Sequence, residues 1–115
     1  RLCTPNLALT IDIINAATGW NWDIEDAQTL GLRVLNLMRL FNFRHGLTKE
    51  IEAPSVRYSS TPTDGPVAGI GIREHWDAIR DNYYEQMGWD VETGKPLPET
   101  LIKYGLEDLV EEVTA

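Results

Sequence analysis

Cys3 has the widest chemical range in this sequence and is its only cysteine. A thiolate can act as a nucleophile or bind a soft metal, but one cysteine cannot form an internal disulfide. Two interpretations stay open: a small buried side chain without chemistry, which residue types alone favour, and one ligand of a metal cluster whose other ligands lie upstream of residue 1. Because the chain begins with Arg1 rather than methionine, we expect it to be part of a larger protein.

The two histidines, His45 and His75, are the other candidates for metal ligands. Glu74 and Asp77 flank His75 and would suit a cation. However, no HxxxH or HExxH spacing places two ligands on one helical face. His45 is expected at the C-terminal end of a helix, where the helix dipole favours a cation without any metal. We therefore interpret both histidines as structural.

The glycine-rich stretch GPVAGIGI, residues 65–72, is a candidate for a phosphate-binding loop. It lacks the spacing of the P-loop and of the dinucleotide-binding fingerprint, and no strand is expected before it. Glu74 and Asp77 would repel an anion at the start of the helix that follows. We reject phosphate binding here.

The composition is that of an ordinary soluble protein, with 43% hydrophobic and 24% charged residues. The net charge of −8 disfavours nucleic acid and anionic membrane surfaces as partners, since both need clustered lysine or arginine. No apolar run approaches the length of a membrane span. A single cysteine is typical of a reducing cytoplasm, which is the location we expect.

Residues 1–115 are expected to form one compact all-α domain of about four to five helices with one long irregular loop. The starts and ends of the helices carry local signals: Thr4 and Pro5 open the first, Asp23 caps the second, and glycines follow several ends. Apolar residues recur at helical spacing between these signals. The predicted helices cover residues 5–18, 24–45, 73–87, 98–104 and 107–113, and the predicted loop covers residues 47–71.

The second predicted helix is apolar on almost every side in its C-terminal half. A helix of this kind is normally buried all round, and a chain this small could hardly cover it alone. We therefore expect a larger body around it, and we expect Phe41 to be buried. Arg33, Arg39 and Arg44 lie on the same helix, so we expect acids or backbone carbonyls to pair with them.

Several separated motifs resemble one known family. GLRVLNLMRLFNFRHGLT, residues 31–48, is similar to G-x-R-x-x-N-L-x-R-x-F-N-x-R-x-G near the C-terminus of tungsten-containing aldehyde ferredoxin oxidoreductases. TDGPVAGIGI resembles the D-G-P-x-x-G step of that family. YYEQMGWD and GKPLPETLIKYGL resemble its Y-Y-x-x-x-G-W-D and the G-x-P…L-x-x-x-G-L ending. These motifs cover most of the chain and occur in the order of the family.

The resemblance implies a C-terminal helical domain of an enzyme that oxidises aldehydes with tungstopterin and a four-iron, four-sulfur (4Fe-4S) cluster. In the family, a G-L-C sequence closes a pterin-contacting loop, and its cysteine is the last of four cluster ligands. Leu2 and Cys3 match this sequence, with Arg1 where glycine is usual. The resemblance therefore implies that Cys3 binds the cluster and Leu2 lies in the pterin loop. It implies the rest of the parent chain and ferredoxin as partners, with no bound cofactor expected in the isolated fragment.

The stretch NYYEQMGWDVETGKP, residues 82–96, places a tryptophan and several charges in a short loop. The family resemblance implies that this loop is structural, with Gly88 ending a helix, Trp89 packed, and Asp90 binding backbone amides of the turn towards Gly94.

The alternative to the enzyme hypothesis is a free-standing acidic helical interaction module without a cofactor.

Overall fold

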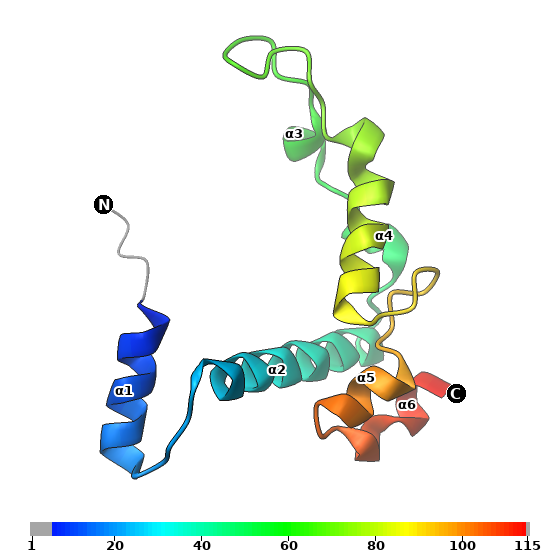
Figure 1. Cartoon of the computed structure of the whole chain (residues 1–115). Helices are drawn as coiled ribbons and strands as arrows, with labels where there is room; N and C mark the ends of the chain where they lie inside the picture. The colour runs from blue at the N-terminus through cyan, green and yellow to red at the C-terminus, as the bar shows by residue number, and fades with distance from the viewer. Residues whose placement is uncertain (1–5, 115) are drawn as a thin grey trace.

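The computed structural model describes residues 6–114, and Figure 1 shows their arrangement. These residues form helices and no strand; the only ladder-type pairing among them is an isolated antiparallel bridge between Trp89 and Pro96. The predicted all-α fold is confirmed. The α-helices are α1 Leu7–Thr18, α2 Ile24–Arg44, α3 Val56–Ser59, α4 Trp76–Met87, α5 Pro98–Lys103 and α6 Glu111–Thr114, with 3-10 turns η1 Lys49–Glu52, η2 Arg73–His75 and η3 Glu107–Leu109.

Helix α1 begins at Leu7, where the Asn6 side chain accepts hydrogen bonds from the backbone of the first turn. The predicted start at Thr4 and Pro5 lies outside the described residues. Gly19, with φ of +76°, ends the helix as predicted. Asn15 then binds the backbone N and O of Trp22 at 2.9 Å each, which fixes the turn into α2.

Helix α2 is the central element and is about 32 Å long from its 21 residues. Asp23 and Asp26 form a reciprocal capping box at its start, with two bonds of 3.0 Å. Asn36, Arg39 and Leu40 are its buried residues.

The prediction that Phe41 is buried was wrong for this chain, because its side chain is 59% exposed. Its ring stacks on His45 of the same helix, with ring centroids 4.1 Å apart. The C-terminal half of α2 carries apolar residues on almost every side, but the described residues cover only one face of the helix.

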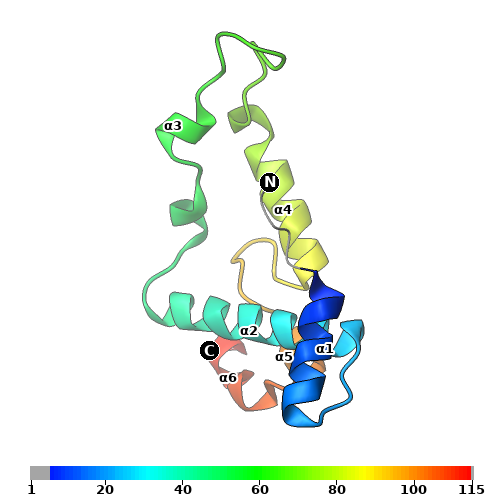
Figure 2. The ribbon, with the colours of Figure 1, turned by 90° about the vertical axis from the view of Figure 1, so that its left-hand side faces the viewer.

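Residues 47–71 are not wholly irregular, because they contain the helical turns η1 and α3. The large apolar residues of this loop are largely exposed: Ile51, Val56, Tyr58, Val67 and Ile70. Polar contacts order it instead, including a hydrogen bond from Arg73 to the buried Ser59. Figure 2 shows α3 and α4 on two arms that leave and return to α2.

The small hydrophobic core joins α2 to the C-terminal helices. Leu40 of α2 packs with Leu101 and Leu106, and the side chains of Leu109, Val110 and Val113 pack against them. In Figure 1, α5 and α6 accordingly lie against the C-terminal half of α2.

No helix within residues 6–114 is long and apolar enough to cross a membrane.

The chain is open in shape. Its radius of gyration is 18.2 Å and its extents are 53 × 46 × 22 Å. A closed domain of this length has a radius of gyration of about 13 Å. The difference arises because α1 and the loop around α3 project from the centre (Figure 1), which leaves apolar surface uncovered.

Candidate functional site

The two residues predicted to contact cofactors, Leu2 and Cys3, lie outside the described residues. Between residues 6 and 114, no group of three or more His, Cys, Asp or Glu side chains is placed to hold a metal ion. His45 Nδ1 lies 2.7 Å from the carbonyl oxygen of Phe41, at the C-terminal end of α2. His75 immediately precedes α4. Their placement at helix ends fits the structural interpretation.

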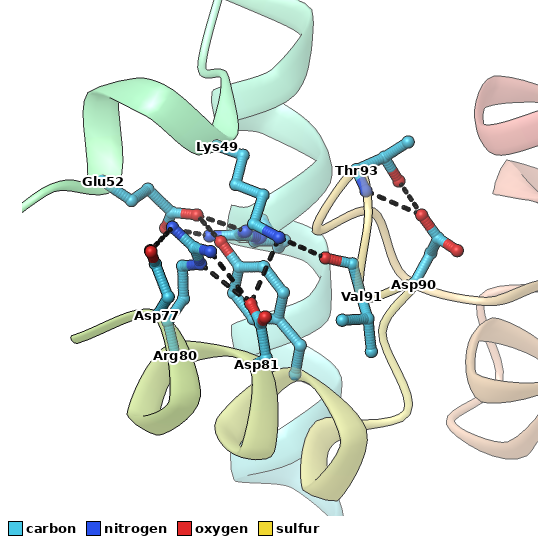
Figure 3. Close-up of polar contacts among 10 residues, drawn as sticks. Lys49, Glu52, Asp77, Arg80, Asp81, Asp90, Val91 and Thr93 are labelled. Carbon is cyan, nitrogen blue, oxygen red and sulfur yellow. Dashed lines mark hydrogen bonds and ion pairs between the residues drawn. The ribbon is translucent and has the colours of Figure 1, made fainter. Parts of the chain in front are cut away.

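The structure brings together a different set of side chains, which we call the Arg39 network: Arg39, Lys49, Glu52, Arg80, Asp81 and Tyr84. These residues come from α2, η1 and α4, which are far apart in the sequence. Figure 3 shows the outer part of the network, where Lys49 of η1 contacts Asp81 of α4 and the carbonyl oxygen of Val91 in the loop after α4.

Arg39 is the centre of the network and is only 7% exposed. Its guanidinium makes a two-pronged ion pair with Glu52, in which Nη2 donates to Oε2 at 2.6 Å. Nε donates to the carbonyl oxygen of Gly94 at 2.9 Å. Tyr84 adds a third contact to the carboxylate by donating its hydroxyl to Glu52. This satisfies the demand that a buried charge be paired and hydrogen-bonded.

Aromatic rings enclose the same guanidinium. Its central carbon lies 4.3 Å from the ring centroid of Trp89, 4.9 Å from Phe43 and 5.1 Å from Tyr84. The negative faces of such rings attract a cation, by about 0.5–2 kcal/mol each depending on burial. The rings also limit the access of water to the ion pair, so the pair is shielded from salt more than a surface pair would be.

The pKa directions follow from these contacts. Burial acts against the charge on Arg39, but the hydrogen bonds to Glu52 and Tyr84 outweigh it and raise the pKa of Arg39. Burial likewise acts against the Glu52 carboxylate, yet the bonds from Arg39 and Tyr84 lower the pKa of Glu52. Burial and the bond to Glu52 raise the pKa of the Tyr84 hydroxyl. These shifts favour charged Arg39, charged Glu52 and neutral Tyr84 at neutral pH.

An outer layer of charges ties η1 to α4 and to the loop after it. Lys49 Nζ donates to the carbonyl oxygen of Val91 at 2.7 Å and lies 3.1 Å from Asp81. Arg80 pairs with Asp81 and with Asp77, each at 3.0 Å. These contacts, visible in Figure 3, hold both ends of the long loop at one place.

Trp89 links the same region to the middle of α2. Its indole Nε1 donates to Asn36 Oδ1 at 2.8 Å, and Asn36 is fully buried. Asn36 Nδ2 donates in turn to the carbonyl oxygen of Leu32. The predicted packing of Trp89 is confirmed.

The predicted role of Asp90 in the turn is also confirmed. Its carboxylate accepts hydrogen bonds from the backbone N and the hydroxyl of Thr93, at 2.7 and 2.6 Å. The hydroxyl and then the amide of Thr93 lower the pKa of Asp90. Gly94 completes the turn with φ of +74°, and an added Cβ there would lie 2.5 Å from Arg39 Nη2. The loop is a structural corner that needs glycine at this position.

Of the three arginines expected to be paired on α2, two are paired. Arg44 forms an exposed ion pair with Glu112, and Arg39 forms the buried one. For Arg33, no ion pair is found within the described part of the chain. The sequence missed Glu52 and Tyr84 as partners of Arg39. Sequence reasoning predicted only that a buried arginine needs an acidic or carbonyl partner, and it could not identify that partner as Glu52.

The Arg39 network is suited to holding elements together rather than to acid–base chemistry, because each carboxylate in it is already paired.

Comparison with known proteins adds what the geometry alone does not contain. A family model described as aldehyde ferredoxin oxidoreductase, domains 2 and 3, matches residues 3–106. The chain belongs to the aldehyde ferredoxin oxidoreductase family. The family resemblance expected from the sequence motifs is thereby confirmed.

Curated relatives agree with this family. The chain is 35% identical over 101 residues to a tungsten-containing aldehyde ferredoxin oxidoreductase of Pyrococcus abyssi, and 34% identical to one of Pyrococcus horikoshii. Each alignment covers 86% of this chain and 16% of the relative. A protein of the same name from Pyrococcus furiosus is 32% identical over 99 residues, covering 84% of this chain and 16% of the relative. The chain thus spans about a sixth of the length of these relatives. No solved structure matches it.

Proposed function

We propose that residues 1–115 are the C-terminal helical domain of a longer tungstopterin and iron–sulfur oxidoreductase. The reaction converts an aldehyde and water to a carboxylic acid, with two protons and two electrons released, and ferredoxin accepts the electrons. The observation that carries this proposal is the family match over residues 3–106, supported by relatives whose names specify tungsten and ferredoxin. A cytoplasmic location belongs to the same proposal. The family match disfavours the alternative of a free-standing interaction module.

The described residues do not themselves offer a site for a metal cluster, since residues 6–114 contain no suitable group of ligands. The proposal therefore assigns only Cys3 to the 4Fe-4S cluster, as one thiolate of four, and Leu2 to the pterin contact. Iron–sulfur clusters are held by several thiolates, so the other ligands would come from the rest of a longer chain.

The contribution of the described residues is scaffolding. The Arg39 network joins α2, η1, α4 and the corner at Gly94, and the core around Leu40 joins α2 to α5. A rigid α2 is a requirement for any site assembled near this domain, since cofactors must be held in fixed geometry.

The test is iron, sulfide and tungsten analysis of the longer protein purified without oxygen, together with paramagnetic resonance of the reduced enzyme. We expect Cys3→Ala to lose the cluster or alter its signal and to uncouple ferredoxin reduction. Cys3→Ser should retain part of the cluster, because a serine alkoxide still has the right length to reach the iron. It should not retain all of it, because an alkoxide is a poorer ligand than a thiolate. The matched control is His75→Gln, which should leave iron content unchanged. A full, unaltered cluster in Cys3→Ala would overturn the assignment of Cys3.

A further inference from the structure

One face of α2 carries an uncharged stripe that the other described elements leave about half exposed. Its members recur at the helical spacings of three and four residues and are each about half exposed, from 44% to 59%: Leu30, Val34, Leu37, Met38 and Phe41. At 100° per residue these positions fall within one side of the helix. No acidic or basic residue interrupts that side.

The opposite face of the same helix is the one that packs inside the chain. It presents Asn36, Arg39 and Leu40, all of which are less than 8% exposed. Helix α2 is therefore apolar on the side that faces away from its own fold. A soluble helix normally shows the reverse pattern, with charged residues on its outer side.

The surroundings of the stripe have the anatomy of a protein interface. At its C-terminal end, the stripe borders a hollow of about 250 Å³ lined in part by Phe41 and Leu109. Arg33 and Arg44 lie along one edge, next to Leu37 on the helix surface. An uncharged centre with a polar rim, here Arg33 and the Arg44–Glu112 ion pair, is typical of surfaces that bind another protein segment.

We propose that this stripe is the surface through which α2 packs against another part of a longer family chain. The lengths of the relatives favour this occupant: they match this chain along 86% of its length, yet the match accounts for only 16% of theirs. A covering segment from the same chain is at high effective concentration, so it does not need the large area that separate molecules require. The proposal rests on the proposed function only in placing these residues within a longer chain.

The open shape of the chain is the reason that the stripe stays uncovered. Burying these five side chains would stabilise the domain, because apolar surface would be removed from water. Residues 6–114 do not bury the stripe, because α1 projects away from the C-terminal half of α2 (Figure 1).

The experiment is thiol footprinting of Val34→Cys, a nearly isosteric change at the centre of the stripe. The control is Gln28→Cys, an exposed polar position on another side of α2. Both variants are made in the 115-residue chain and in the longer protein. Each is labelled with a maleimide under native conditions, and the labelled peptides are quantified by mass spectrometry, which separates them from Cys3. Leu30→Cys serves as a second stripe position, with circular dichroism to verify folding.

We expect the stripe thiol to label at least about tenfold more slowly in the longer protein than in the 115-residue chain, because burial limits labelling to rare openings. The control should change little between the two. Equal labelling of the stripe thiol in both proteins would overturn the proposal. So would protection already present in the 115-residue chain that increases with protein concentration, since a second copy would then be the occupant. Iron content and ferredoxin reduction, measured on the same unlabelled longer variants, report separately on the proposed function.

Discussion

Replacing Arg39 with methionine tests whether the Arg39 network holds the domain together. Methionine keeps most of the aliphatic volume beside Trp89 but removes the charge and all the donors. The carboxylate of Glu52 is then left with the Tyr84 hydroxyl, and the carbonyl of Gly94 loses its partner. Removing one member of a buried ion pair costs about 3–5 kcal/mol. Because the Glu52 side chain is 23% exposed and water can partly solvate it, we expect the lower end, about 3 kcal/mol.

The assay is urea unfolding at neutral pH, followed by circular dichroism and by tryptophan fluorescence. The matched control is Arg44→Met on the same helix, where the arginine of the ion pair is 65% exposed. An exposed pair contributes at most about 1 kcal/mol, so the control should melt close to the original chain. The double variant R39M/E52Q should lose less than the sum of its single changes, because it removes the unpaired carboxylate as well.

The reasoning would be refuted if Arg39→Met and Arg44→Met lowered the free energy of unfolding by the same small amount. The contacts to Glu52 and Gly94 would then contribute little net stability. An additive double variant would point to the same conclusion, since coupled groups deviate from additivity.

Three further predictions concern the same helix and its contacts. Because the pKa of Glu52 is lowered in the folded chain, its contribution to stability is present above its unfolded pKa of about 4.3 and is lost as pH falls through the lowered folded pKa. Glu52→Gln should therefore lose less stability than the original chain as pH falls below about 4.3, measured by urea melts. Gly94→Ala should cost about 2–4 kcal/mol from its φ of +74° and the clash with Arg39, whereas Gly31→Ala, with open space around it, should cost nothing or stabilise slightly; thermal melts of both check this. Phe41→Ala should cost less than about 1 kcal/mol in denaturant melts of this chain, since the side chain is 59% exposed; a loss of 3 kcal/mol or more would mean that it is buried in solution.

The sequence predicted the helices well because the signals that start and stop them are local. Asp23 caps α2 and Gly88 ends α4 through contacts within a few residues, which a linear reading can recognise. It also predicted that Arg39 requires a partner, since burial of a charge demands one. The partner itself, Glu52, lies 13 residues away beyond a change of direction, and only the folded chain places it.

Phe41 illustrates the opposite limit. Its apolar surroundings and its place in a family motif both suggested burial, but burial depends on what lies against a face rather than on the face alone. A pattern can identify which residues seek cover without identifying what covers them. The same limit applies to Leu2 and Cys3, whose assignments rest on the family resemblance.

The closure of the long loop at its base has a consequence for sequence divergence. Glu52 with Tyr84, and Lys49 with Asp81, hold the two ends of the intervening segment together. The segment between them is therefore a closed excursion, and changing its length alters little besides the entropy of closure. That entropy grows slowly, by about 0.6 kcal/mol for each doubling of length. Changes in the length of this segment should accordingly be tolerated better than changes in the spacing from Tyr84 to Gly94.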